Sequence, residues 1–343
     1  MKKIHDIVLT GGPCAGKTTA IATLVRELTQ KGYTVFVVPE TATELIKSGY
    51  APWQDCTNNY EFQRFVLKKQ LDKELLYSEI AEEISAEKIV ILYDRGSLDG
   101  KSYIKDEDFS KLLASFHLDE VMVKAGYDAI FHLVTAAKGA REFYTLSNNE
   151  ARTESPEEAI RLDELGIKNW NGHPHLRIID NSTDFEGKLK RLLKEVYAVL
   201  GEPVPLEIEH KYLIEKPNLA ELSELVSIEV IDILQTYLIS ENENTERRIR
   251  QFGKNGNYSY YYTEKKEITA LKRVEIERCI TKDEYLRLLT EADTTLHQIS
   301  KKRVCFVYDS QYFELDIYPN SNNNIEYNQA ILEIEVTEEN SEI

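Results

Sequence analysis

The sequence predicts an α/β domain with a parallel sheet covered by helices on both faces, followed by an α+β domain of antiparallel strands. Short apolar runs alternate with helical patterns in the first half, and long runs that alternate charged and apolar residues fill the second. A chain of 343 residues exceeds one ordinary core, so two domains are expected. They are placed at 1–201 and 206–337, with a linker at 202–205 and an acidic tail at 338–343.

The composition limits the classes of function. The chain is 42 % hydrophobic and 29 % charged, and its formal charge of −17 disfavours broad binding to nucleic acids or to anionic membranes. No apolar stretch is long enough to span a bilayer, and the first residues lead into a glycine-rich loop rather than form a signal peptide. Four cysteines without paired or zinc-like spacing favour the reducing cytoplasm.

The first half reads as a series of buried parallel strands and covering helices. Capping boxes predict helix starts at Thr41 with Glu44 and at Ser155 with Glu158, the latter with Pro156 in the first helical position. Strands are expected at 4–10, 34–38, 89–93, 129–134 and 176–179, and helices at 17–30, about 60–86 and 185–200.

A phosphate-binding loop, GGPCAGKT, lies between the first strand and the first helix. Backbone N–H groups of such a loop surround an anion, and its glycines let the backbone come close. Lys17 is expected to reach the β- and γ-phosphates, and Thr18 to hold Mg²⁺. The residues expected to bind ATP or GTP here are Gly11, Gly12, Pro13, Cys14, Ala15, Gly16, Lys17, Thr18 and Thr19.

Polar residues follow the second and third strands, where a parallel sheet gathers its ligands. Asp94 is placed to bind Mg²⁺, and Arg95 to bind an acceptor or the transferring phosphate in bidentate fashion. Glu40 is expected to act as a general base toward an acceptor hydroxyl. The alternative for Glu40 is a carboxylate that only serves the helix entry near Thr41.

GGPCAGKT, PET and YDRG resemble the nucleoside-kinase-like and nicotinamide-riboside-kinase-like branch of P-loop proteins. The resemblance implies a kinase-like or AAA-type ATPase domain. It makes Gln63 a candidate substrate contact, with an ordinary exposed helix glutamine as the alternative. It also implies a mobile lid whose arginine stabilises the transferring phosphoryl group, for which Arg152 is preferred to Arg141 and Arg161.

In the second half, charged residues recur at positions i and i+2, which share one face of a strand. One arrangement is an ordinary sheet with its charged face in water. The other is a closed eight-stranded barrel whose lumen carries both signs, with cations on one wall and carboxylates on another. Buried charges are costly unless paired or metal-bound, so such a lumen implies a ligand. Strands are expected near 206–214, 228–240, 244–252, 257–266, 270–280, 302–308, 311–318 and 328–337.

An E-x-E-x-K pattern lies at 207–211. It is followed in order by R-x-R, T-x-K, E-x-E, basic, acidic and final E-x-E positions. This ordered set resembles the CYTH, or triphosphate tunnel metalloenzyme, superfamily. The resemblance implies that Glu207, Glu209 and Lys211 belong to the catalytic machinery. It implies that phosphates bind to Lys211, Arg248, Arg250, Lys265, Lys301 and Arg303. It implies that Mg²⁺ or Mn²⁺ binds to Glu207, Glu209, Glu333 and Glu335, with Asp316 and Glu277 assisting.

The pairing of the two halves resembles the group of the TRPL translocation defect protein and its microbial relatives, which implies GTP binding and a peripheral lipid contact. We expect a metal-dependent phosphohydrolase or phosphotransferase whose ligands are a nucleotide and a phosphorylated small molecule. The alternative is a nucleotide-switched binding protein whose tunnel senses a phosphorylated ligand or lipid without turnover. ATP versus GTP, the acceptor, the tunnel substrate, the coupling of the halves and the oligomeric state stay open.

Overall fold

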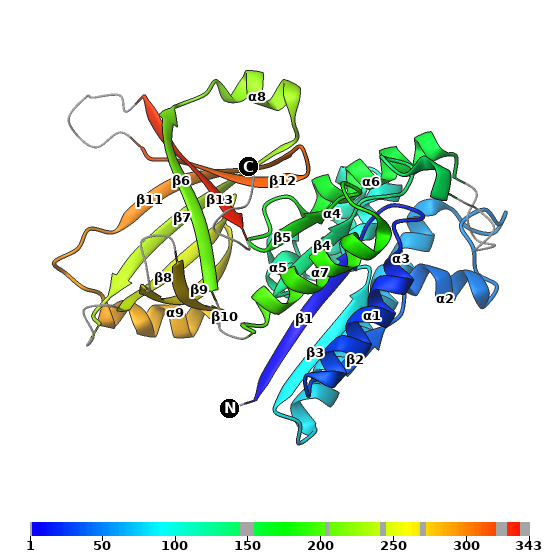
Figure 1. Cartoon of the computed structure of the whole chain (residues 1–343), viewed down its shortest axis with the longest axis horizontal. Coiled ribbons are helices and arrows are strands. Elements are labelled where there is room, and N and C mark those ends of the chain that lie inside the picture. Colours follow the sequence, from blue (N-terminus) through cyan, green and yellow to red (C-terminus); the bar gives the residue numbers. More distant parts are fainter. Residues whose placement is uncertain are drawn as a thin grey trace. The chain divides into compact units, whose positions relative to one another are not determined.

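The computed structural model describes residues 2–144, 154–202, 206–240, 245–267, 272–319 and 328–336. The chain divides into two compact units, Met1–Leu193 and Lys194–Ile343 (Figure 1). The first contains a parallel sheet with helices and the second an antiparallel barrel, as the sequence predicts. Among the described helices, none combines the length and the apolar character needed to cross a membrane.

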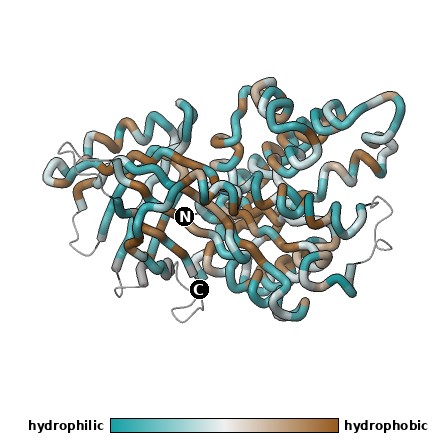
Figure 2. The backbone as a smooth tube through the Cα atoms, turned by 90° about the horizontal axis from the view of Figure 1, so that it is seen from above, coloured by the Kyte–Doolittle hydropathy of each residue, from teal (hydrophilic) through white to brown (hydrophobic). Residues whose placement is uncertain are grey.

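The sheet of the first unit has the strand order β2-β3-β1-β4-β5, and every pairing is parallel. All five residues of β4 are buried, and four of them are apolar, as is typical of a central parallel strand. In Figure 2 the strands of this sheet are predominantly hydrophobic. The strands are β1 (Lys3–Thr10), β2 (Thr34–Val38), β3 (Lys88–Asp94), β4 (Ala129–Leu133) and β5 (Leu176–Ile179).

Helix α1 packs near β1, β2 and β3, and α3 packs near β2, whereas α6 packs against β4. Ser155 caps α6 as predicted, because its hydroxyl accepts a hydrogen bond from the Glu158 N–H at 3.2 Å. The helices are α1 (Lys17–Gln30), α2 (Thr41–Lys47), α3 (Asn59–Glu83), α4 (Asp106–Ser115), α5 (Glu120–Ala125), α6 (Pro156–Trp170) and α7 (Phe185–Val199), with 3₁₀ turns η1 (Asp99–Tyr103) and η2 (Arg141–Phe143).

The predicted cap at Thr41 is wrong. Glu40 occupies the N-cap position of α2, and Thr41 is the first helical residue. The Thr41 hydroxyl instead donates a hydrogen bond to Gln70 Oε1 on α3, at 2.6 Å. A buried acceptor on a neighbouring helix therefore replaces the local cap, and this turn holds Glu40 at the start of α2.

The second unit is a closed barrel with the order β10-β6-β13-β12-β11-β7-β8-β9, and its pairings are antiparallel. Asn255 and Gly256, both with positive φ, form the tight turn between β8 and β9. The strands are β6 (Leu206–Glu215), β7 (Ile228–Leu238), β8 (Thr245–Lys254), β9 (Asn257–Glu267), β10 (Lys272–Ile280), β11 (Ile299–Tyr308), β12 (Gln311–Ile317) and β13 (Gln329–Val336).

Two apolar clusters lie on the outer face of the barrel wall. One packs Ile249 with Tyr285 and Leu288 of α9 (Lys282–Leu288), which is followed by the 3₁₀ turn η3 (Leu289–Glu291). The other packs Leu315 against α8 (Leu219–Leu225). Because alternate residues of a strand face opposite sides, the charged neighbours of Ile249 and Leu315 turn into the lumen. The arrangement with a charged face in bulk water is therefore wrong.

Candidate functional site

The phosphate loop runs from the end of β1 into α1. Gly11 has φ +140°, and a Cβ there would lie 2.0 Å from the carbonyl oxygen of Leu133. Only glycine therefore fits this position. Lys17 is the first residue of α1, and its Nζ donates to the Gly11 carbonyl at 3.2 Å. Burial and the nearby Arg95 charge lower the pKa of Lys17, while the side chains of Thr18 and Thr19 are exposed.

A cavity of about 260 Å³ lies beside the loop. Lys17, Glu40, Gln63 and Arg95, which the sequence analysis selected separately, all line it. Its remaining wall combines apolar and aromatic side chains with polar ones such as Thr41 and Asp99. The fold therefore brings the ammonium of the phosphate loop and the polar residues that follow β2 and β3 to the lining of one cavity. The aromatic wall residues, which the sequence analysis did not identify, are Trp53, Phe62, Tyr103 and Phe109.

Glu40 and Arg95 form a close ion pair, with Arg95 Nε 2.6 Å from Glu40 Oε1. Burial alone would raise the pKa of Glu40, but the charges of Arg95 and Lys17 lower it to about 2. In this arrangement Glu40 is a weak base, because an efficient general base has a pKa near the working pH. A ligand phosphate that binds Arg95 in place of Glu40 would remove the main cause of the low pKa of Glu40.

Asp99 fixes the turn that follows β3. It accepts hydrogen bonds from the Thr10 hydroxyl and, at 2.7 Å, from the Gly96 N–H. Its carboxylate also lies 3.6 Å from Arg95 Nη1. Arg95 itself has φ +73°, a strained conformation that these contacts support. The sequence analysis missed Asp99, although its spacing of four residues from Arg95 was a usable signal.

Asp94 ends β3 next to the phosphate loop, paired in register with Leu9 of β1. Its Oδ1 is buried and has no hydrogen-bond partner within the described residues. Burial raises the pKa of Asp94, and the charge of Lys17 opposes that shift. An unpaired buried carboxylate oxygen near Lys17 fits the oxygen ligand that Mg²⁺ prefers. Asp94 does not line the 260 Å³ cavity.

Gln63 is 6 % exposed, so the alternative of an ordinary exposed helix glutamine is wrong. It lines the cavity. A Cβ at Gly100 would lie 2.6 Å from Gln63 Oε1, so glycine leaves room for the amide. Gln63 is thus available to a ligand in the cavity.

The arginines expected on a lid do not reach the cavity where the structure describes them. Arg141 pairs with Glu157 at 2.7 Å, and Arg161 pairs with Glu158 at 2.7 Å. Both pairs are exposed. Arg152, the preferred candidate, lies outside the described residues, so its role stays a prediction.

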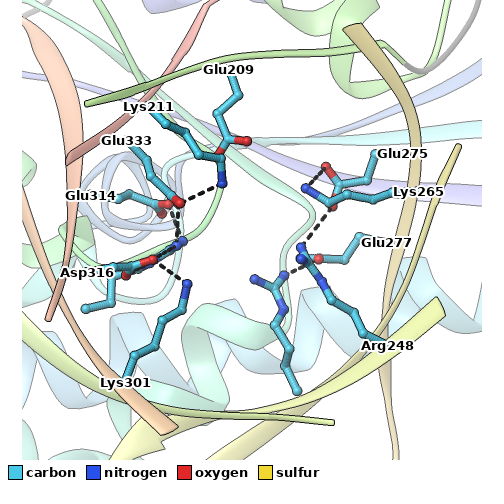
Figure 3. Close-up of polar contacts among 12 residues, drawn as sticks. Glu209, Lys211, Arg248, Lys265, Glu275, Glu277, Lys301, Glu314, Asp316 and Glu333 are labelled. Atoms are coloured by element: carbon cyan, nitrogen blue, oxygen red, sulfur yellow. Dashed lines mark hydrogen bonds and ion pairs between the residues drawn. The ribbon is translucent and has the colours of Figure 1, made fainter. Parts of the chain in front are cut away.

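In the barrel lumen, cations and carboxylates alternate on one wall built by β11, β12 and β13. Arg303 donates to Asp316 at 2.7 and 2.8 Å, to Glu333 at 2.7 Å, and also to Glu314. Lys301 pairs with Asp316 as well. Burial raises the pKa of Glu314 to about 7, and burial together with Arg303 lowers that of Lys301 to about 8. Figure 3 shows Lys301, Glu314, Asp316 and Glu333 turned toward one another.

A second group of paired charges comes from β8, β9 and β10, which Figure 3 places across the lumen. Arg250 pairs with Glu277, which also accepts the Thr263 hydroxyl at 2.8 Å. Glu275 lies 3.4 Å from Lys265 and 3.9 Å from Arg248. The expected division into a cationic wall and an acidic wall is therefore wrong, because each wall neutralises its own charges. The sequence analysis assigned no role to Glu275 or Glu314.

Lys211 joins two of the predicted metal ligands, at 3.1 Å from Glu209 and 2.7 Å from Glu333. Glu335 is partly buried, and the side chain of Glu207 lies outside the described residues. Glu277 stands with Arg250 on the far wall. Among the described side chains, no group of three or more acidic, histidine or cysteine residues is close enough to hold a metal ion. Of the predicted metal ligands, Glu209, Glu277, Asp316 and Glu333 are each paired with a cation of the lumen.

Comparison with known proteins gives one family and several partial structural likenesses. A family model described as an AAA domain matches residues 6–188. No curated protein matches the chain in sequence. The structure of the inorganic triphosphatase NE1496 is 24 % identical, over 39 % of this chain and 75 % of that chain, with a TM-score of 0.25. The PH1819 protein from Pyrococcus horikoshii OT3 is 23 % identical, over 38 % and 76 %, with a TM-score of 0.29. The closed barrel is shown by the strand pairing of this chain alone.

Proposed function

The chain belongs to the AAA domain family through residues 6–188, and we propose that it is a metal-dependent enzyme acting on phosphate chains in both halves. The first half binds ATP or GTP and hydrolyses it or passes its terminal phosphoryl group to a small acceptor. The barrel binds and hydrolyses a triphosphate or pyrophosphate compound. Cys14, Cys56, Cys279 and Cys305 form no disulfide, which is consistent with the cytoplasm as the compartment.

One observation carries the barrel half of the proposal: buried cations from several strands converge in a closed lumen. Arg250, Lys265, Lys301 and Arg303 are each less than 10 % exposed. Burying so many ionic groups costs free energy that an apolar core would not cost. A polyanionic ligand that replaces the carboxylates as the partner of these cations would explain why the cations are buried there. Guanidinium and ammonium groups from several different strands suit the successive phosphates of a phosphate chain.

The first half supplies matching parts around its cavity. The loop amides and Lys17 would hold the β- and γ-phosphates. Arg95 would bind the transferring phosphate and Glu40, freed from Arg95, would accept a proton from the acceptor hydroxyl. Gln63 and the aromatic wall would hold the acceptor. Thr18 and Asp94 would hold Mg²⁺, and in the lumen Glu207, Glu209, Glu333 and Glu335 would hold Mg²⁺ or Mn²⁺. Bound metal supplies polarisation of the phosphoryl group.

A nucleotide-switched binding protein is the second candidate, and the state of Glu40 favours it. A carboxylate with a pKa of about 2 and a partner at 2.6 Å is poorly suited to take a proton. A protein of this kind would bind GTP or ATP tightly, turn it over slowly and capture a phosphorylated ligand or lipid in one nucleotide state. Such behaviour is what the resemblance to the TRPL translocation defect group implies.

Phosphate release tests the proposal. The full chain is incubated with ATP, GTP, inorganic triphosphate and pyrophosphate, in Mg²⁺, Mn²⁺ or a chelator. Lys17→Ala should abolish the nucleotide activity of the first half, and Glu207→Ala/Glu209→Ala should abolish that of the barrel. Lys31→Ala at the end of α1, and Glu221→Ala/Glu224→Ala on α8, are matched controls expected to leave both activities unchanged.

The outcomes separate the two candidates. Release of phosphate that disappears with the chelator and with one variant assigns that activity to one half. Tight nucleotide binding without release from any compound contradicts the enzyme and supports the switch.

A further inference from the structure

Two buried, charged side chains from separate helices contact the main chain of the phosphate loop. Asp163 of α6 is 0 % exposed and Lys188 of α7 is 2 % exposed. Neither belongs to the loop motif, and the sequence pattern gives neither a role. Because burying a charge is costly, each needs a reason to be present.

Asp163 holds the first turn of the loop through one oxygen. Its Oδ1 accepts hydrogen bonds from the Gly12 N–H at 2.9 Å and the Thr135 N–H at 3.0 Å, and lies 3.1 Å from His132 Nε2. The carbonyl and N–H of a trans peptide point in opposite directions. With the Gly12 N–H directed at Asp163, the Gly11 carbonyl of the same peptide points the other way, where it accepts from Lys17 Nζ.

Lys188 holds the far end of the loop. Its Nζ donates to the carbonyls of Val134 at 2.6 Å and Ala15 at 3.3 Å, and to Asn181 Oδ1 at 2.8 Å. Because the Ala15 carbonyl is directed at Lys188, the Gly16 N–H of the same peptide points away from it. This N–H is one of those at the start of α1, where anions bind.

The charge of Asp163 is the wrong sign for a nearby phosphate. Burial would raise its pKa, but His132 and the backbone donors lower it, so the side chain is an anion beside an anion-binding loop. It therefore opposes nucleotide binding electrostatically. Its geometry, and not its charge, accounts for its place.

We infer that Asp163 and Lys188 are positioning residues for nucleotide binding, which fix two peptide planes of the phosphate loop before the ligand arrives. The inference rests on the proposed binding of a nucleotide at this loop. The conservative variant Asp163→Asn keeps an acceptor oxygen for the N–H groups of Gly12 and Thr135 while it removes the repulsive charge. The inference therefore predicts that this variant retains nucleotide binding.

The test measures dissociation constants for fluorescent ATP and GTP with Mg²⁺ on the full chain, together with thermal unfolding. Asp163→Ala should weaken binding about tenfold or more, as expected for loss of a buried acceptor. Asp163→Asn should bind as tightly as wild type or several-fold more tightly. Lys188→Met should weaken binding about tenfold. The ratio of its dissociation constant to that of wild type should be the same at high salt, where a purely electrostatic effect is screened.

Asp119→Ala is the matched control in the same unit. Asp119 also accepts two backbone N–H groups, from Val121 at 2.8 Å and Met122 at 3.0 Å, at the start of α5. This variant should lower the unfolding temperature and leave nucleotide affinity unchanged. Wild type that binds no nucleotide contradicts the proposed function itself.

Wild type that binds, alongside folded Asp163→Ala and Lys188→Met that bind equally well, overturns the positioning role. So does an Asp163→Asn variant as weak as Asp163→Ala. If Asp163→Ala does not fold, Asp163→Asn and Lys188→Met decide the matter by the same criteria.

Discussion

Removing the Arg303 guanidinium should destabilise the barrel much more than removing a surface arginine. Arg303 pairs with Glu314, Asp316 and Glu333, and its side chain is 7 % exposed. Taking one partner from a buried ion pair costs about 3–5 kcal/mol, because the other charges stay buried and unpaired. Lys301 still pairs with Asp316 in the variant. We therefore expect Arg303→Met to lose about 3 kcal/mol of unfolding free energy.

Arg287→Met is the control. Arg287 lies on α9, is 65 % exposed and contacts only Glu284 and Glu291 among the described acidic residues. Exposed pairs contribute about 0–1 kcal/mol, so this variant should differ little from wild type.

Urea unfolding of the full chain measures both variants. The two tryptophans, Trp53 and Trp170, belong to the first unit, so their fluorescence follows that unit alone. Circular dichroism in the far ultraviolet follows both units. With a slope of roughly 2 kcal/mol per M, Arg303→Met should move the barrel transition by roughly 1.5 M and leave the fluorescence transition in place. Equal transitions for Arg303→Met and Arg287→Met would refute the enclosure of the lumen charges.

Three further predictions concern the first unit. Gly11→Ala should abolish nucleotide binding in a titration, because its Cβ would clash with the Leu133 carbonyl. The control is Gly32→Ala, whose Cβ meets nothing within 4 Å; it should lower the unfolding free energy by only about 1–2 kcal/mol and keep nucleotide binding. Burial raises the pKa of Asp6 to about 7, so folded protein holds a proton that the unfolded chain loses near pH 4. Its contribution to stability is therefore lost as pH rises from about 4 to 7, by up to about 1.4 kcal/mol per unit, and Asp6→Asn should flatten this slope in unfolding curves. If Glu40 is the general base, Glu40→Gln should lower kcat by about 10²–10⁴ with nucleotide affinity unchanged.

Local patterns were sufficient to predict most elements of the fold. The buried run at β4 and the phosphate loop carry their own signals, and β5 was placed at its observed bounds, Leu176–Ile179. The ends of strands were harder to predict from the sequence. β11 begins at Ile299 rather than at 302, because Ile299 pairs with Gln235 of β7, a contact distant in sequence. Thr41 was misassigned for the same reason, since its partner Gln70 is on another helix.

The sites show the same limit. Alternation along strands predicted which charges share a face, but it contains no information on which cation meets which carboxylate. That choice depends on strand register, as in Glu314 opposite Glu333 and Lys211 opposite Glu333. Asp163 has no local signal at all, because the groups that it binds are 28 and 151 residues away in the sequence.

The observed pairing connects phosphate binding to metal binding in the proposal. In the lumen Arg303 is paired with three carboxylates, and Lys211 with two, one of which, Glu333, they share. A triphosphate that takes these donors leaves the carboxylates unpaired and adds its own negative charge to the same enclosed space, which is electrostatically unfavourable. Divalent cations, which prefer oxygen ligands, restore the balance. The predicted carboxylate ligands thus become available when the phosphates bind, so triphosphate affinity should fall steeply when a chelator removes the metal, and titration calorimetry with and without Mg²⁺ measures this difference.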